Sequence, residues 1–309
     1  MSPPPAKPGL SLASWLHHRG GLVLTVSLGT ALVAVTAGAG AAPPGPISSA
    51  TVSATAGPAT LVPHPSASTV SARPNVARAV AVAPASLSVR SARVTKIVLN
   101  PGHNGANWSH PRAISRQVPA GFGQHKNCDT TGTATNGGLS EHAFNWDVSL
   151  RVRKILQARG ITVILTRPSD HGVGPCVDTR ARIGNQAGVA AVISIHADGA
   201  RSSGHGFHVS EASRRPHGAA VAAASHRLTV AVHDALRARS GMTTSTYLGW
   251  NGYYPRADLS GLNLARVPAT FVEIGNMRNR GDAAIQASPS GRQRIAGAVA
   301  AGILRWLGR

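Results

Sequence analysis

The chain has 309 residues, 42% of them apolar, which is enough to build a buried core for one or two domains. It carries 31 Lys and Arg against 11 Asp and Glu, a formal net charge of +20. That charge favours an anionic partner. We find no zinc-finger spacing, no RRM-like aromatic signature and no dense Lys/Arg run, so we expect that this partner is not nucleic acid.

The acidic residues divide the chain into two parts. All 11 Asp and Glu lie at or after Asp129, whereas the first 94 residues hold six Lys or Arg and no acid. The other 25 basic residues and all 11 acids therefore fall from Thr95 onward, which gives this part a formal charge of +14. An anionic cell envelope would suit such a charge if the protein is exported.

The N-terminus is typical of an exported protein. An apolar run over residues 20–42 follows the basic Arg19 and ends in small residues that fit a cleavage site. We therefore expect a signal peptide over residues 1–42 and a location in the periplasm or cell envelope. The run also approaches the length of a bilayer span, so an uncleaved membrane anchor is the alternative.

The remaining chain is predicted to be a linker followed by one folded domain. Residues 43–94 are rich in Ala, Pro and Ser with almost no charge, which predicts a disordered linker. Residues 95–309 alternate apolar runs with helical patterns, which predicts an α/β fold around a mainly parallel sheet. We expect strands at 96–100, 162–166, 191–196, 206–210 and 269–274, and helices at 140–157, 179–187, 218–238 and 291–307. The segment 106–139 is too long for a plain connection, so we expect it to border a site.

Two cysteines fit the same compartment. Cys128 and Cys176 are the only ones in the chain, and an exported protein with two cysteines can close one disulfide. Two unpaired thiols are the alternative interpretation.

A histidine stands just beyond the first predicted strand. The stretch TKIVLNPGHNG runs from Thr95 to Gly105, and Pro101 and Gly102 end its apolar part before His103. Ligands of open α/β sheets gather outside the carboxyl ends of the strands. His103 is therefore a candidate metal ligand, although one histidine in such a place proves little.

Glu141 and His196 are candidates for the same site. Glu141 shares a helical stripe with Phe144, Val148 and Val152, and a carboxylate on a buried stripe is costly unless it is paired or bound to a metal. A first-turn acid angled toward water is the alternative. His196 ends a continuous apolar strand, where a core histidine bonded to a carbonyl is the alternative. With His103 they would form a three-ligand zinc site with its fourth position open.

Glu273 lies late in the last apolar strand, where a buried carboxylate is costly. It can be a general base beside a metal-bound water, or it can form an ion pair with Arg278. Three tyrosines, Tyr247, Tyr253 and Tyr254, occur near Trp250 and can stack on a substrate or simply pack; we favour packing.

Five motifs together make the chain resemble a known family. In order they are NPGHNG (100–105), GLSEHAFN (138–145), ITVILTR (161–167), VISIHADG (192–199) and VPATFVEIGNMRN (267–279). They resemble the zinc-dependent N-acetylmuramoyl-L-alanine amidases of the Amidase_3 type. The resemblance implies a three-layer α/β/α sandwich around a mixed, mainly parallel sheet, and cleavage of the amide between the lactyl group of N-acetylmuramic acid and L-alanine of the stem peptide. It also implies that His103, Glu141 and His196 bind Zn²⁺ and that Glu273 is the catalytic acid/base.

Two other functions stay open at this point. One is an exported wall-binding or activator protein without activity, and the other is a zinc carboxypeptidase that acts on the stem peptide and uses Arg256 or Arg278 to hold a free carboxylate. We expect a monomer with peptidoglycan as partner, and membrane contact only through an uncleaved N-terminal segment. The residues that contact the substrate are not assigned.

Overall fold

The structure, a computed structural model, describes residues 95–309, so the predicted signal peptide and linker lie outside the described part. The strands are β1 (Lys96–Pro101), β2 (Gln117–Gly121), β3 (Gln124–Asn127), β4 (Thr162–Leu165), β5 (Val189–Asp198), β6 (His208–Ser210) and β7 (Ala269–Asn276). The helices are the 3-10 turn η1 (Asn107–Ser109), α1 (Pro111–Ser115), α2 (Glu141–Gln157), α3 (Val177–Gly184), α4 (Gly218–Arg239), α5 (Ser260–Asn263), α6 (Arg280–Ala287) and α7 (Pro289–Trp306).

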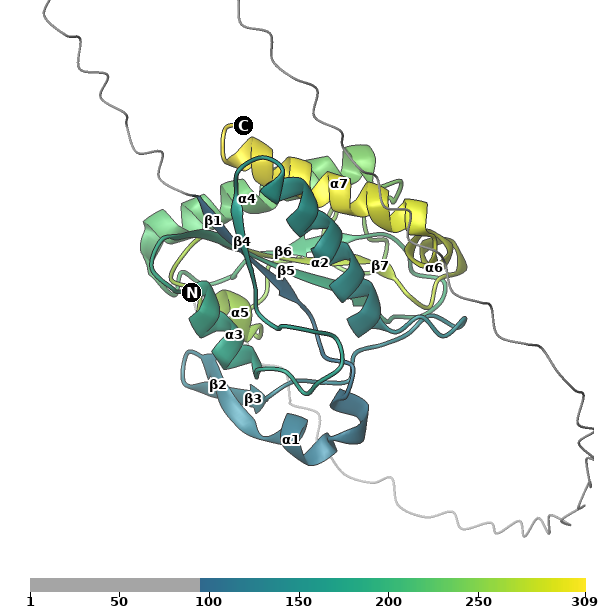
Figure 1. Cartoon of the computed structure of the whole chain (residues 1–309), viewed down its shortest axis with the longest axis horizontal. Helices are drawn as coiled ribbons and strands as arrows, with labels where there is room; N and C mark the ends of the chain where they lie inside the picture. The colour runs from purple at the N-terminus through teal and green to yellow at the C-terminus, as the bar shows by residue number, and fades with distance from the viewer. Residues whose placement is uncertain (1–94) are drawn as a thin grey trace, which may run out of the picture. The chain divides into compact units, whose positions relative to one another are not determined.

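One mixed sheet organises the described domain. Its strands follow the order β4-β1-β5-β7-β6, and Figure 1 shows the sheet crossing the middle of the domain with helices around it. The neighbouring pairs from β4 to β7 are parallel, and only the edge strand β6 runs antiparallel to β7. The carboxyl ends of β1, β5 and β7 therefore reach the same edge of the sheet, where the sequence predicts the site.

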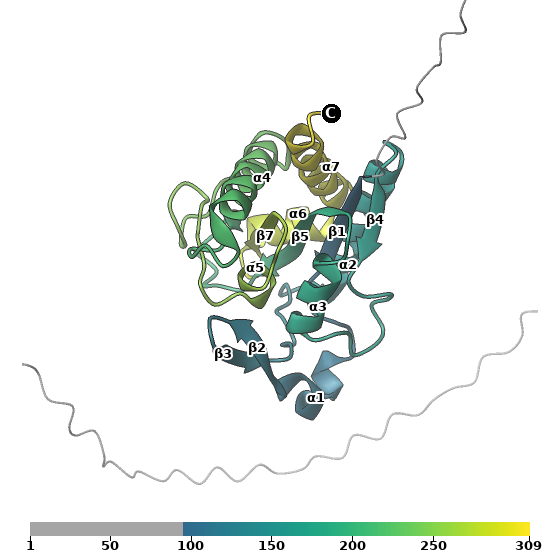
Figure 2. The ribbon, with the colours of Figure 1, turned by 90° about the vertical axis from the view of Figure 1, so that its left-hand side faces the viewer.

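Helices cover both faces of the sheet. Helices α2, α4 and α7 pack on one face, and α3 and α5 lie on the other (Figure 2). The larger core lies under α2, α4 and α7, and a smaller one lies under α3 and α5. The predicted three-layer α/β/α sandwich is confirmed.

Local sequence explains where the covering helices begin and how closely they pack. Helix α7 begins where the Ser288 hydroxyl accepts a hydrogen bond from the backbone N–H of Gly291, with Pro289 in the first turn. Further along, a Cβ at Gly302 would lie 2.6 Å from the Cα of Val232 in α4. Glycine at this position therefore allows the close contact between α4 and α7.

The predicted elements are all present, but several of their bounds differ, and the structure contains further short elements. The helix expected at 179–187 begins and ends earlier, at Val177 and Gly184, and the strand expected at 206–210 begins only at His208. The β2–β3 hairpin, η1, α1, α5 and α6 were not predicted. The hairpin lies inside the segment 106–139, where turn residues and polar side chains hide a short strand pair from a search for apolar runs.

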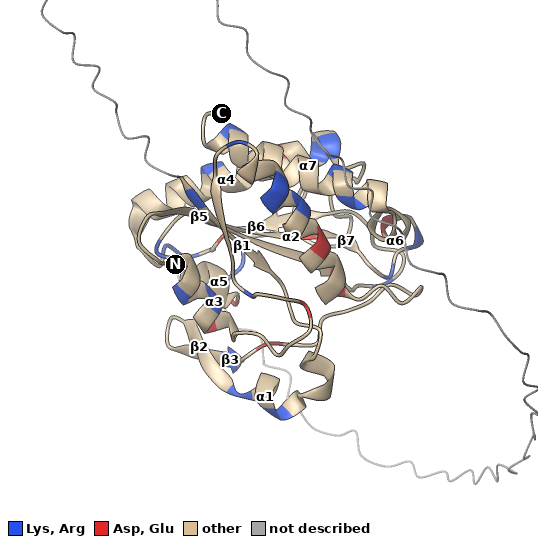
Figure 3. Cartoon of the chain, in the orientation of Figure 1, with Lys and Arg blue, Asp and Glu red and all other residues tan. Residues whose placement is uncertain are grey.

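The charged residues of the domain are mainly basic. Figure 3 shows Lys and Arg positions on α1, α2 and α7, with few Asp or Glu positions among them. Within residues 95–309, no helix combines the length and the apolar character that crossing a membrane requires.

Candidate metal centre

The turn after β1 presents His103 in an unusual backbone conformation. His103 has φ of +58°, in the left-handed region, where a non-glycine residue needs support from its surroundings. Two buried arginines provide that support. Arg180 of α3 donates to the carbonyls of Pro101 (2.6 Å) and His103 (3.0 Å), and Arg167 also donates to the Pro101 carbonyl (3.1 Å).

Three predicted ligands converge beyond the sheet edge. The potential donor atoms of His103, Glu141 and His196 all lie within 4.8 Å of one another. Glu141 lies between the two rings: its Oε2 is 3.2 Å from His103 Nε2, and its Oε1 is 3.0 Å from His196 Nδ1. The sequence prediction that these three side chains meet is confirmed.

Glu141 is the first residue of α2 and is buried, as its place on the helical stripe predicts. Its orientation is fixed by backbone donors. The N–H of Thr133 donates to Oε2 (3.0 Å) and that of Ala197 donates to Oε1 (3.2 Å). The alternative of an acid angled toward water is therefore wrong. The His196 ring is held from the other side, where it stacks on Phe271 with ring centroids 4.4 Å apart.

The electrostatics of the cluster favour a cation. Burial disfavours the charged form of His103, yet the carboxylates of Glu141 and Asp129 outweigh burial and raise the pKa of His103 to about 10. Burial lowers the pKa of His196, and its one carboxylate partner, Glu141, does not compensate. Despite its own burial, the pKa of Glu141 is held well below its usual range by His103 and His196. The carboxylates of Glu141 and Asp129 thus stabilise positive charge at His103, and they would stabilise a metal cation at the same place.

Glu273 stands beside this cluster on the neighbouring strand. It is the register partner of His196 in the β5–β7 pair, and its Oε2 has no hydrogen-bond partner among the described residues. Burial, assisted by the carboxylates of Glu141 and Asp198, raises its pKa well above the usual range. The alternative pairing with Arg278 is not found, because Arg278 donates to the Ala134 carbonyl and to Asn136 instead.

A cavity of about 390 Å³ joins these four residues. The segment Asp129–Thr133, from the long connection that was expected to border a site, forms one wall, and this expectation is confirmed. Two cations, Lys126 of the hairpin and Arg256, also line the cavity. Lys126 Nζ donates to the carbonyl of Asp258, whose carboxylate accepts two bonds from Arg256.

The three tyrosines of the aromatic segment pack against neighbouring side chains, whereas Trp250 is 86% exposed. Tyr253 stacks on His233 with ring centroids 4.0 Å apart, and Tyr247 donates to Asp198 (3.1 Å). Neither residue, nor Tyr254 nor Trp250, is among those that line the cavity. Packing, which the sequence interpretation favoured, is therefore the structural role of the three tyrosines.

Sequence reasoning missed the groups that surround the ligands. Asp129, buried at 8% exposure, contacts His103 Nδ1 (3.2 Å) and Arg180 (3.2 Å). Arg167 and Arg180 are buried as well. One available signal was the cysteine pair: Cys128 and Cys176 form the predicted disulfide, and it brings the segments of Asp129 and Arg180 together.

Comparison with known proteins defines the family. The family described as N-acetylmuramoyl-L-alanine amidase (Amidase_3) matches residues 97–305, and the chain belongs to it. An N-acetylmuramoyl-L-alanine amidase of Mycobacterium tuberculosis is 44% identical over 211 residues, which cover 68% of this chain and 86% of that protein. The resemblance drawn from the five motifs is confirmed.

Solved structures agree with this assignment. The crystal structure of the amidase Ami1 from Mycobacterium smegmatis superposes with a TM-score of 0.65 at 46% identity, over 69% of this chain and 97% of that one. The amidase AmiC2 of Nostoc punctiforme has a TM-score of 0.53 at 23% identity, over 70% and 98% of the two chains, and it supports the fold alone.

Proposed function

We propose that the protein is a peptidoglycan hydrolase that cleaves the amide between the lactyl group of N-acetylmuramic acid and L-alanine of the stem peptide. Membership of the amidase family supports this reaction class. The observation that carries the proposal at the level of the site is the cluster of His103, Glu141 and His196 in a cavity that Glu273 also lines.

Zn²⁺ is the cation that we propose for this cluster. Two imidazoles and one carboxylate are the donor set of many catalytic zinc sites, which keep a further position open. The ionised Glu141 between the two rings adds the negative charge that a divalent cation needs. When bound, Zn²⁺ supplies a Lewis acid that polarises a carbonyl and makes water a better nucleophile near neutral pH.

Glu273 is the group that we propose to move the proton. Its carboxylate accepts a proton from the attacking water and then delivers it to the amine of the departing L-alanine. Burial raises the pKa of this carboxyl group, and general acid–base catalysis is most efficient when the pKa of the acting group matches the working pH. The free Oε2 leaves one oxygen available for this exchange.

We also propose that the protein is exported to the cell envelope, where peptidoglycan is found. We propose that it acts there as a monomer. A basic exterior supports retention at an anionic wall. The signal peptide over residues 1–42 and the linker over 43–94 stay predictions, and so does an uncleaved membrane anchor.

Mass spectrometry of digested muropeptides tests the reaction. We expect the full chain to release intact stem peptides, and we expect a chelator to stop the release until Zn²⁺ is added back. Shortened stems would assign the protein to the carboxypeptidases instead. Binding to peptidoglycan without any product would identify a wall-binding or activator protein.

The role of Glu273 is tested by Glu273→Gln, which keeps the size of the side chain and removes its basicity. We expect turnover to fall at least ~100-fold, the usual scale for a lost general base, with bound zinc unchanged. Glu211→Gln is the matched control, because Glu211 pairs with His226 and lies outside the metal centre. If Glu273→Gln turned over substrate at nearly the rate of the wild type, Glu273 would not be the group that transfers the proton.

A further inference from the structure

The two ring nitrogens of His103 face different partners. Nε2 faces Glu141 within the cluster, at 3.2 Å from Oε2. Nδ1 lies 3.2 Å from Asp129 Oδ1 and 3.0 Å from the carbonyl oxygen of Thr130. Both of the latter are acceptors, so Nδ1 donates its proton to them. If a metal ion replaced the proton on Nε2, Nδ1–H would keep these acceptors and Nε2 would present its lone pair to the cluster, as a metal ligand requires.

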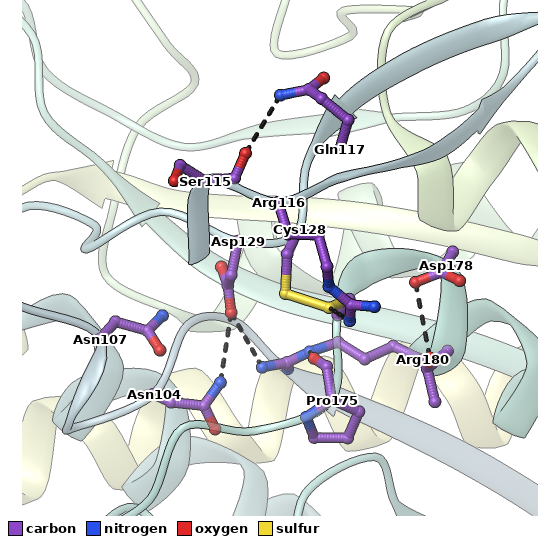
Figure 4. Close-up of a disulfide and its surroundings, with 12 residues drawn as sticks. Asn104, Asn107, Ser115, Arg116, Gln117, Cys128, Asp129, Pro175, Asp178 and Arg180 are labelled. Atoms are coloured by element: carbon purple, nitrogen blue, oxygen red, sulfur yellow. Dashed lines mark hydrogen bonds and ion pairs between the residues drawn. A yellow bond between two sulfur atoms is a disulfide. The ribbon is translucent and has the colours of Figure 1, made fainter. Parts of the chain in front are cut away.

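Asp129 is itself held in place from two sides. Its Oδ2 accepts from Asn104 Nδ2 and from Arg180 Nη2, both at 3.2 Å, and its Oδ1 accepts from the backbone N–H of Thr130 at 2.8 Å. Figure 4 shows the carboxylate between Asn104 and Arg180. Although burial would raise it, the pKa of the Asp129 carboxyl is held far below its usual range by the hydrogen bond with His103 and by the charge of Arg180.

The disulfide ties together the two segments that carry this ion pair. Cys128 directly precedes Asp129, and Cys176 is the N-cap of α3, one helical turn before Arg180. The N–H of Arg180 donates to the Cys176 carbonyl, and the N–H of Val177 donates to the Cys128 carbonyl, both at 2.9 Å. The segments that carry Asp129 and Arg180 are therefore joined by a disulfide as well as by an ion pair (Figure 4).

The disulfide is separate from the cavity. Both sulfur-bearing residues are buried, Cys128 at 3% and Cys176 at 5% exposure, and they pack with Val118 in a small apolar cluster. Neither residue lines the cavity. Any influence of the disulfide on the metal centre must therefore pass through its neighbours, and Asp129 is the neighbour in contact with a ligand.

We propose that Asp129 is the positioning residue of the metal ligand His103, and that the Cys128–Cys176 disulfide raises metal affinity by holding Asp129 there. This inference rests on the proposed metal site. Partners that orient a ligating histidine commonly change metal affinity 10–100-fold. Loss of the disulfide leaves Arg180 and Asn104 in place, so its effect on affinity is smaller than that of losing the carboxylate.

Zinc affinity, measured by competition with a fluorescent chelator on the full chain, tests the proposal independently of amidase activity. We expect Asp129→Asn to bind zinc ~10–100-fold more weakly than the wild type. The double variant Cys128→Ala/Cys176→Ala should bind several-fold more weakly; alanine avoids free thiols that would themselves bind zinc. Asp147→Asn is the matched control, because Asp147 is also paired with arginines, Arg151 and Arg292, but on α2 away from the cavity.

The combination of changes separates the proposal from general destabilisation. In the Asp129→Asn background, removal of the disulfide should lower zinc affinity no further, because the two changes act through one contact. Additive losses, or unchanged affinity in Asp129→Asn, would overturn the proposal. Unchanged zinc affinity in the double cysteine variant would show that the disulfide has no part in metal binding. A wild-type protein that binds no zinc would instead contradict the proposed metal site itself.

Discussion

His208 is expected to make the protein sensitive to acid. It is the residue of β6 opposite Glu273, it is 1% exposed, and within residues 95–309 neither of its ring nitrogens has a hydrogen-bond partner. Burial lowers its pKa from 6.5 to about 4, with Arg256 adding to the effect and Asp198 opposing it. The edges of Tyr247 and Tyr254 complete its surroundings.

The sign follows from proton binding. Because the pKa of His208 is lower in the folded state, the unfolded state binds the proton at a higher pH. The contribution of His208 to stability is therefore complete above pH 6.5 and is lost as the pH falls toward 4. The full difference between the two pKa values corresponds to about 3 kcal/mol. Between pH 7 and pH 4.5 the loss assigned to this one group is about 2 kcal/mol.

Urea unfolding of the wild type and of His208→Phe at these two pH values measures this loss. Phenylalanine keeps an aromatic ring against the tyrosines and does not titrate. We expect the wild type to lose about 2 kcal/mol more than the variant on acidification. His125→Phe, the same substitution at an exposed position of the hairpin, should leave the acid loss of the wild type unchanged. Equal losses in the wild type and in His208→Phe would refute the reasoning.

Two further predictions concern a close approach and a helix cap. A Cβ at Gly102 would lie 2.1 Å from Cε1 of His196, so Gly102→Ala should displace that ring and weaken zinc binding at least ~10-fold, as the chelator competition would show; unchanged affinity would contradict this contact. Asn279 caps α6 by accepting from the N–H groups of Gly281 and Asp282. Asn279→Ala should therefore cost about 1 kcal/mol in urea unfolding, and a loss below a few tenths would mean that the cap contributes little.

Much of the sheet and its covering helices could be predicted, because the sequence patterns of these elements are local. The β5 and β7 strands stand out as nearly continuous apolar runs, which is typical of strands covered on both faces. The burial of Glu141 follows from its helical spacing to Phe144. Each of these inferences needs only a short window of sequence. Each candidate ligand was found near one terminus of a predicted strand or helix.

The groups around the ligands depend on contacts between distant segments. In the sequence, Arg180 is one more charged residue on a predicted helix, and its local pattern does not point to Asp129, 51 residues away. Arg167 likewise satisfies carbonyls 65 and 66 residues earlier in the chain. Such pairs become visible only when a long-range restraint is applied. The cysteine pair offered one, because a bond between Cys128 and Cys176 necessarily places their neighbours side by side.

The distribution of charge connects the metal centre with the basic exterior. Of the 11 acidic residues, four line the cavity: Asp129, Glu141, Asp198 and Glu273. Within a domain whose formal charge is +14, these acids are therefore concentrated at the cavity, and the carboxylates of Glu141 and Asp129 lie on the two sides of His103 there. A cation is therefore attracted to the centre, while the outer surface attracts an anionic polymer. These two fields need not oppose each other, because burial keeps the carboxylates close to their own partners and the surface charges are screened by solvent.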